Sequence, residues 1–168
     1  MPTAIAKRNR PTLGSAAKVP QAGALSLAGS GLESQDAWTV DGEALVTDVP
    51  LTFLGFVNRR TGVVEEPGHP LDGQSIAGKV LVFPRGSGST VAPYVLLGLL
   101  YRNRGPLAVV NTELDQQTLP ACSLLGVPYA HSFGRDPCLA LNSGDRVRLE
   151  LRGGAVTLEV LERAPVAG

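Results

Sequence analysis

The feature that most constrains the fold is a strand–helix–strand pattern in the middle of the chain. Residues 78–83 form an almost continuous apolar run, which is typical of a strand buried on both faces of a sheet. Residues 91–103 carry apolar side chains around most of a helical circumference, and Pro93 lies in the first turn, where proline is tolerated. Residues 107–111 form a second buried strand. The pattern predicts a βαβ unit at the centre of an α/β domain.

A hairpin is predicted near the end of the chain. Residues 146–152 and 155–161 alternate apolar and polar side chains around Gly153-Gly154, a pair that suits a tight turn. The buried face of this hairpin is expected to consist of Val147, Leu149, Leu151, Val156, Leu158 and Val160.

Weaker patterns complete the prediction. They indicate strands over residues 43–48, 51–57 and 127–131, a loop over residues 58–76, and a short helix within residues 112–125. Gly55 is expected to form a bulge or a point of close approach in its strand. Thr112 to Asp115 are expected to cap the short helix, which Pro120 would break. The expected architecture is therefore β-rich at both ends around one βαβ core.

The first 36 residues differ from the rest. They are rich in Ala, Gly, Ser and Pro without a sustained period, so residues 1–36 are predicted to be a flexible tail and residues 37–168 the domain. The basic residues near the start are not followed by the apolar run of a secretory signal. No stretch approaches the roughly 20 apolar residues of a membrane span, so a cytoplasmic protein without membrane contact is expected.

Charge and cysteine content exclude some functions. Lysine plus arginine and aspartate plus glutamate each total 15, so the net charge is zero and no nucleic-acid partner is expected. The two cysteines, Cys122 and Cys138, lack zinc-ligand spacing and are too few to bind a four-thiolate iron–sulfur cluster. We expect both to be partly buried free thiols and no metal to be bound by this chain.

The candidate functional segment is the turn between the first buried strand and the helix. It consists of Arg85, Gly86, Ser87, Gly88, Ser89 and Thr90. Ligands favour this edge of α/β sheets, helix N-termini attract anions, and arginine suits a carboxylate or phosphate. The turn matches neither a P-loop, nor a dinucleotide-binding turn, nor a nucleophile elbow. The structural alternative is a turn that only caps the helix through Ser89 or Thr90.

Several segments together resemble a known family. They are Glu43–Val46, Leu51–Gly55, Thr61–Val64, His69–Leu71, Gly78–Pro84, Gly88–Val91, Tyr94–Leu96 and Gly144-Asp145. The most specific run is Val80–Val91. From Gly42 to about Arg152, the chain resembles the swivelling domain of the aconitase X family.

The resemblance implies a swivelling β/β/α fold, with a mixed or barrel-like sheet around the βαβ unit. It implies a hydro-lyase that is active only with a large subunit, which would hold a [4Fe–4S] cluster. In the family the serine of Gly-Ser-Thr-Val accepts a proton, and Ser89 occupies that position. Arg85, Gly86, Ser87, Gly88 and Thr90 are then expected to bind substrate. The similarity is greatest to the branch that dehydrates (R)-5-phosphomevalonate to trans-anhydromevalonate 5-phosphate, with cis-3-hydroxy-L-proline as the alternative substrate.

Two other functions stay open from the sequence. The chain could be a non-catalytic binding domain of the same fold, or a self-sufficient hydrolase that uses Ser87 or Ser89, although the elbow motif is missing. His69 is expected to be structural or solvent-facing, His131 to be an edge histidine with satisfied hydrogen bonds, and Asp115 to cap a helix. Arg59-Arg60 is expected to form a solvated turn or contact a partner.

Overall fold

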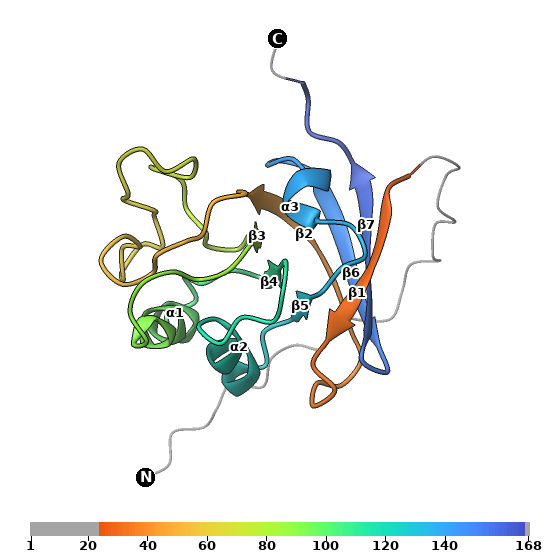
Figure 1. Cartoon of the computed structure of the whole chain (residues 1–168), viewed down its shortest axis with the longest axis horizontal. Helices are drawn as coiled ribbons and strands as arrows, with labels where there is room; N and C mark the ends of the chain where they lie inside the picture. Colours follow the sequence, from red (N-terminus) through yellow and green to blue (C-terminus); the bar gives the residue numbers. More distant parts are fainter. Residues whose placement is uncertain (1–23, 167–168) are drawn as a thin grey trace.

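A computed structural model describes residues 24–166 of the chain, and in it seven strands close into a barrel with the order β1-β5-β4-β3-β2-β6-β7 (Figure 1). The elements are β1 (Ser26–Gly31), β2 (Trp38–Val46), β3 (Val80–Phe83), α1 (Ala92–Tyr101), β4 (Ala108–Asn111), α2 (Leu119–Leu125), β5 (Tyr129–His131), α3 (Pro137–Ala140), β6 (Arg146–Arg152) and β7 (Ala155–Glu162). Among these helices, none is long and apolar enough to cross a membrane. The expected barrel-like α/β fold is confirmed.

The βαβ unit is confirmed and forms the parallel half of the barrel. β3 pairs in parallel with β4, in a register that sets Val80 beside Ala108 and Phe83 beside Asn111. β2 and β5 extend this half on either side, also in parallel. All residues of β3 and β4 are buried, as their almost continuous apolar sequences predict, and Asn111 at the end of β4 is the one polar residue among them. Because parallel strands end at the same edge, the segments that follow β3 and β4 start side by side.

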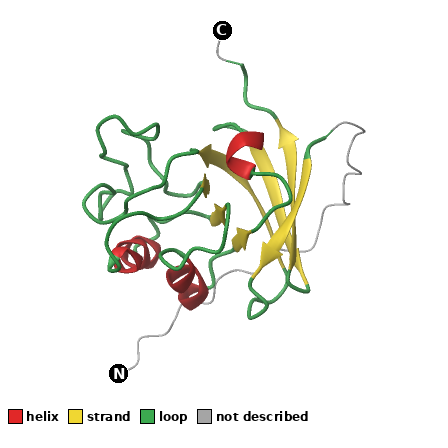
Figure 2. Ribbon diagram, viewed as in Figure 1, coloured by secondary structure: helices red, strands yellow, loops and turns green. Residues whose placement is uncertain are grey.

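The antiparallel half contains the predicted hairpin. β6 pairs with β7 around Gly153-Gly154, and every residue assigned to its inner face is buried. β2 continues this half beyond β6, and β1 joins β7 to β5, which closes the barrel (Figure 2).

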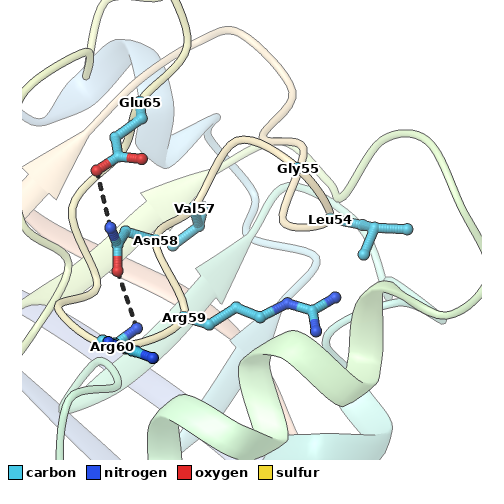
Figure 3. Close-up of a pocket in the computed structure, with 7 residues that line it drawn as sticks. All are labelled: Leu54, Gly55, Val57, Asn58, Arg59, Arg60 and Glu65. Carbon is cyan, nitrogen blue, oxygen red and sulfur yellow. Dashed lines mark hydrogen bonds between the residues drawn. The ribbon is translucent and has the colours of Figure 1, made fainter.

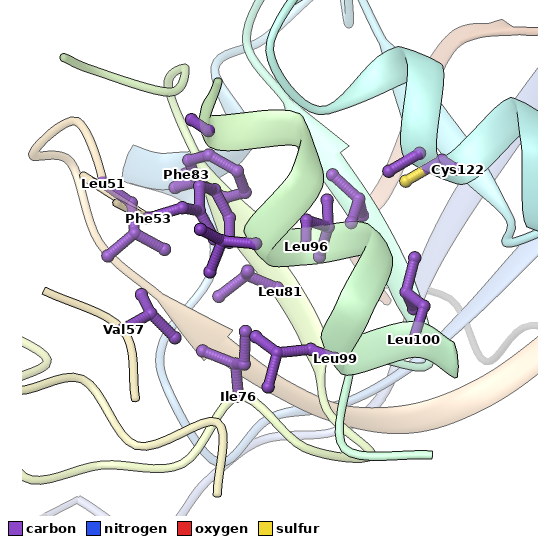
Figure 4. Packing of buried hydrophobic residues seen from close by; sticks show 14 of the residues in the cluster. Leu51, Phe53, Val57, Ile76, Leu81, Phe83, Leu96, Leu99, Leu100 and Cys122 are labelled. Atoms are coloured by element: carbon purple, nitrogen blue, oxygen red, sulfur yellow. The ribbon is translucent and has the colours of Figure 1, made fainter. Parts of the chain in front are cut away.

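Two hydrophobic clusters lie on the two sides of the sheet. Successive residues of a strand point to opposite faces, so Val80 and Val82 join one cluster while Leu81 and Phe83 join the other. The first cluster includes the inner face of the hairpin. The second lies between the sheet and α1, where Leu96 packs above Leu81 (Figure 4). This packing fixes α1, and with it the turn that precedes it.

Part of the segment predicted to be a flexible tail is a strand of the barrel, so this part of the prediction is wrong. The sequence analysis assigned residues 1–36 to a tail, but β1 lies within that range and hydrogen-bonds to both β5 and β7. Residues 1–23 lie outside the described residues. β2 also begins at Trp38 instead of residue 43, so the ordered barrel includes the segment expected to be its boundary.

The strand predicted over residues 51–57 is also wrong. Leu51 and Val57 form only isolated bridges, to Gly86 and Val64. Gly55 has a φ of 91° and lies in a turn instead of a bulge. Leu51, Phe53 and Val57 are buried in the cluster beneath α1, whereas Phe56 is exposed, so the apolar pattern of this segment reports partial burial without a strand ladder.

The short helix starts later than predicted. α2 begins at Leu119 with Thr118 as its N-cap residue, so Thr112 does not cap it. Pro120 lies in the first turn, where its missing N–H costs no helical hydrogen bond, and it does not break the helix. The residues between β4 and α2 form turns that place Asp115 next to Gly86. Gly86 belongs to the segment that joins β3 to α1 (residues 84–91), which is called the candidate turn below.

Candidate functional site

The candidate turn, residues 84–91, follows β3 and leads into α1. Its first part pairs with a segment far back in the chain: the N–H of Leu51 donates to the carbonyl of Arg85 at 3.1 Å, and the N–H of Ser87 donates to the carbonyl of Leu51 at 3.0 Å. Leu51 is fully buried. These two bonds form a short parallel bridge that fixes the backbone on both sides of Gly86.

Asp115 holds the same turn from the other side. Its Oδ2 accepts a 2.9 Å hydrogen bond from the N–H of Gly86, and its Oδ1 accepts one from the N–H of Gln117 at 3.2 Å. The segments around Gly86 and Gln117 approach each other so closely that a Cβ on Gly86 would lie 2.7 Å from Oε1 and 2.9 Å from Cβ of Gln117. Only glycine fits at this position without displacing its neighbour.

Asp115 belongs to a buried polar network. Oγ1 of Thr118 lies 2.8 Å from Oδ2 of Asp115 and 2.8 Å from Oδ1 of Asn111, whose Nδ2 donates to the carbonyl of Phe83 at 3.1 Å. The hydroxyl of Tyr129 accepts from the N–H of Asp115 at 2.9 Å. Burial raises the pKa of Tyr129 well above its usual range, so this phenol stays neutral. The network ties the carboxyl ends of β3 and β4 and the first residue of β5 to the candidate turn.

Ser89 lies at the exposed apex of the turn. Gly88, which precedes it, has a φ of 85°, a conformation that L side chains rarely adopt. The Oγ of Ser89 accepts a hydrogen bond from the N–H of Val91 at 3.3 Å, and its carbonyl accepts one from Ala92 at 3.0 Å. The structural alternative of a helix cap is not realised in its usual form, because Val91 is the N-cap residue and no side chain caps α1.

The amides around Ser89 give the turn its chemical character. Val91, Ala92 and Tyr94 donate their N–H groups within the turn and first helical turn, and Pro93 has none. In contrast, the N–H groups of residues 88–90 donate no hydrogen bond to any described residue. Unpaired amides at the positive end of a helix favour an anion or a developing negative charge.

The predicted residues Arg85 to Thr90 thus lie in one turn, although they are not equally accessible. Arg85 is exposed, and its Nη1 lies 3.4 Å from the carbonyl of Gly86. Gly86 is buried and Ser87 is half-buried, whereas Gly88, Ser89 and Thr90 are exposed. Any substrate on Ser89 would be open to solvent on this chain alone.

His69 is buried and its ring contacts two backbone groups, which corresponds to the structural alternative and not to the solvent-facing one. Its Nδ1 accepts from the N–H of Leu71 at 3.0 Å, and its Nε2 lies 3.2 Å from the carbonyl of Pro50. It therefore steadies the residue before Leu51, the backbone partner of the turn.

The remaining residues that the sequence analysis named outside the turn form no hydrogen bond with Ser89. His131 is half-buried on β5, where burial lowers its pKa. Arg59 and Arg60 line a hollow beside α1. Asp115 is not the helix cap that the sequence indicated but a direct partner of Gly86.

Sequence reasoning missed most of the supporting network. Asn111 carried one detectable signal, since a polar residue at the carboxyl end of a buried strand often serves a site. Tyr129 and Leu51 carried none, because they reach the turn only through tertiary pairing.

The two cysteines do not fit an iron–sulfur cluster. Both are free and buried, and burial raises the pKa of each thiol to about 12, far from the thiolate that a cluster requires. Within residues 24–166, no group of three or more His, Cys, Asp or Glu could hold a metal. The described part of this chain therefore does not supply a cluster site.

Comparisons with known proteins agree with this geometry. The sequence profile of the aconitase X swivel domain matches residues 34–158. A phosphomevalonate dehydratase small subunit of Methanococcoides burtonii is 37% identical over 118 residues, which cover 70% of this chain and 86% of that relative. A protein of the same name from Methanopyrus kandleri is 41% identical over 117 residues, again 70% and 86%.

A solved structure shows the same fold. The crystal structure of Thermococcus kodakaraensis aconitase X in its holo-form superposes with a TM-score of 0.71 at 35% identity, over 82% of this chain and 99% of that one. The profile, the relatives and the barrel agree, and the chain belongs to the aconitase X swivel-domain family.

Proposed function

We propose that this chain is the small subunit of an aconitase-X-type hydro-lyase, and that Ser89 accepts a proton during dehydration of a hydroxy acid. The observation that carries the proposal is the exposed Ser89 hydroxyl, held by the Val91 N–H among three amides without acceptors in the described residues. The names of the relatives, as dehydratase small subunits, support a large partner chain. A half-site open to solvent is consistent with such a partner.

The proposed substrate is (R)-5-phosphomevalonate, which would yield trans-anhydromevalonate 5-phosphate and water. Support comes from the shared name of relatives that are 37–41% identical. Arg85 is exposed within the turn and is proposed to bind a carboxylate or phosphate of the substrate. Activity on cis-3-hydroxy-L-proline would place the chain in the alternative branch.

The proposed role of Ser89 depends on stabilising its oxyanion. Dehydration removes a proton from the carbon next to the carboxylate and breaks the bond to the departing hydroxyl, and Ser89 Oγ would receive that proton. An ordinary serine hydroxyl barely ionises near neutral pH. The Val91 N–H donates directly to Oγ, and the positive end of α1 lies next to it, so both would favour the charged oxygen.

Asp115 and Leu51 would contribute by fixing the turn. Between them they hold the backbone from Arg85 to Ser87, which keeps Ser89 in place without contacting it. The [4Fe–4S] cluster is proposed to belong to the large subunit, because the described residues of this chain provide no ligand set for it.

The test is Ser89→Ala in the complex of this chain with its cognate large subunit. We expect complex formation to be unchanged and dehydration to fall by at least about 10²-fold, the lower end of what a positioned proton-transfer group contributes. Turnover is measured with phosphomevalonate under anaerobic conditions. Ser34→Ala is a matched control, since Ser34 is exposed in the turn between β1 and β2. Near-normal turnover by Ser89→Ala would refute the role of Ser89.

A further inference from the structure

Helix α1 has two distinct faces. One is buried in the hydrophobic cluster and consists of Ala92, Val95, Leu96, Leu99 and Leu100 (Figure 4). On the opposite face, Tyr94 and Tyr101 are 72% and 81% exposed, and Arg102 at the C-cap lies beside them. Tyr94 and Tyr101 therefore present two large aromatic side chains on one exposed helical face, the kind of side chain enriched where proteins bind each other.

A hollow lies in the middle of this face. It has a volume of about 280 Å³ and is lined by Arg59, Arg60, Tyr94, Val95, Gly98 and Arg102. A second hollow of about 310 Å³ adjoins it between Tyr94 and Tyr101. The exposed helical face is therefore indented where Gly98 lacks a side chain.

Interior packing does not explain Gly98. A Cβ at this position would meet only the far end of the Arg102 side chain, at 3.4 Å, which is an ordinary contact. Glycine also disfavours a helix relative to almost every other residue. A glycine that weakens α1 and opens its outer face is explained if another surface approaches closely there.

The rim of the hollow is positively charged. Arg59 extends from its turn towards α1, away from the Asn58–Glu65 hydrogen bond (Figure 3). None of Arg59, Arg60 and Arg102 forms a salt bridge with another described residue. A complementary surface would therefore present carboxylates to these guanidinium groups.

We infer that the large subunit of the proposed dehydratase binds here, on a docking face made of Tyr94, Gly98, Tyr101 and Arg102 of the α1 segment with Arg59 and Arg60. This inference rests on the proposed function. Its occupant inserts an apolar side chain over Gly98 and places carboxylates opposite the arginines. Tyrosine and arginine are the residues most enriched at the energetic centres of interfaces.

The position of the docking face identifies its occupant. Val91, whose N–H bonds Ser89 Oγ, directly precedes the first turn of α1, and Tyr94 lies one helical turn further on. A partner that encloses a substrate over Ser89 would therefore lie close to the start of this face. One continuous surface can both complete the site and dock the two chains.

Gly98→Gln gives the sharpest test. Glutamine is a good helix former, so the free chain should melt at an equal or higher temperature, while the filled hollow should weaken binding to the cognate large subunit by at least tenfold. Arg102→Glu should weaken binding by a similar factor and reduce the salt dependence of the Kd. Arg152→Glu is the charge-matched control, because Arg152 is exposed on the distant β6–β7 hairpin (Figure 1).

The outcomes separate this inference from the proposed function. Both are supported if Gly98→Gln and Arg102→Glu weaken binding, Arg152→Glu does not, and Ser89→Ala binds normally without turnover. Wild-type affinity in both docking-face variants, with Ser89→Ala still inactive, overturns the docking face and leaves the function intact. Failure of the wild-type chain to bind its large subunit overturns both.

Discussion

Asp115 fixes the backbone of the candidate turn, although it forms no hydrogen bond with Ser89. It is 8% exposed, and its carboxylate accepts from the Gly86 and Gln117 amides and lies 2.8 Å from the Thr118 hydroxyl. Asp115→Asn keeps the size of the side chain. If its Nδ2 took the place of Oδ2, one donor would face another at Gly86, and the turn would have to move.

For Asp115→Asn we expect at least a tenfold loss of kcat in the assembled enzyme, with a loss of about 1–3 kcal/mol in the free energy of unfolding. Turnover and urea denaturation measure the two effects. Asp136→Asn is the matched control, because Asp136 accepts a 2.8 Å bond from the Cys138 amide at the start of α3, away from the turn. It should keep kcat and most of its stability, because the side-chain oxygen of asparagine can accept the same hydrogen bond at a helix N-cap. An Asp115→Asn enzyme with wild-type kcat would show that Asp115 only stabilises the fold.

At this scale the sequence located the turn but not its supports. Glycine, serine and arginine between a strand and a helix form a local pattern, so residues 85–90 could be identified directly. Asp115 was found only as a capping residue, because its contact with Gly86 spans 29 positions and depends on the pairing of β3 with β4. Such contacts leave no periodic signal in one sequence.

At the scale of elements, β1 shows why a strand can escape prediction. Its sequence contains three small residues and two glycines, a composition that normally disfavours strands. The glycines are needed for space: a Cβ on Gly29 would lie 2.6 Å from the Phe133 ring, and one on Gly31 would lie 2.5 Å from Leu151. Neighbouring side chains fill the place of the missing ones. By contrast, β3, β4 and the hairpin were predicted correctly because their own apolar residues form the core.

The seam between β1 and β5 should respond to pH through His131. Ser30 is the cross-strand neighbour of His131, and burial lowers the pKa of this histidine below its usual 6.5. The unfolded chain then binds a proton at a higher pH than the folded chain does. The free energy of unfolding therefore falls as the pH drops below about 6.5.

We expect His131→Gln to remove part of this dependence. Between pH 7.5 and 5.5 the melting temperature of the wild-type chain should fall more than that of the variant, as followed by circular dichroism. His69, the other of the two histidines in the sequence, remains in both proteins and provides the common background. Parallel pH profiles for the two proteins would contradict the assignment to His131.

At the scale of the whole molecule, the candidate site lies on the parallel half of the barrel, and the antiparallel strands close the barrel. The parallel half ends at the candidate turn and carries α1, whereas the antiparallel half contributes the inner face of the hairpin to the other cluster. The resemblance in sequence implied this architecture. Helix and strand periodicity alone did not, because closing the barrel needs β1, which has no apolar alternation.

Asp145 joins the two ends of the antiparallel half. It is fully buried and accepts hydrogen bonds from the N–H groups of Asn142 and Ala164 and from Nη1 of Arg163, at 2.8–2.9 Å. Arg163 also donates to the carbonyl of Ala140 at 3.1 Å. One carboxylate thus connects the turn before β6 to the residues after β7.

Asp145→Asn should therefore destabilise the whole barrel. An amide can accept only through its single oxygen, which leaves at least one buried donor without a partner, and we expect a loss of about 1–3 kcal/mol in the free energy of unfolding. Urea denaturation with an unchanged m-value would show that the folded state alone is affected. Asp41→Asn is the contrasting variant, because the Asp41–Arg148 pair is about one-third exposed and should contribute less than about 1 kcal/mol. Equal losses of unfolding free energy in the two variants would contradict this prediction. They would show that the burial of Asp145 does not increase the contribution of its hydrogen bonds to stability.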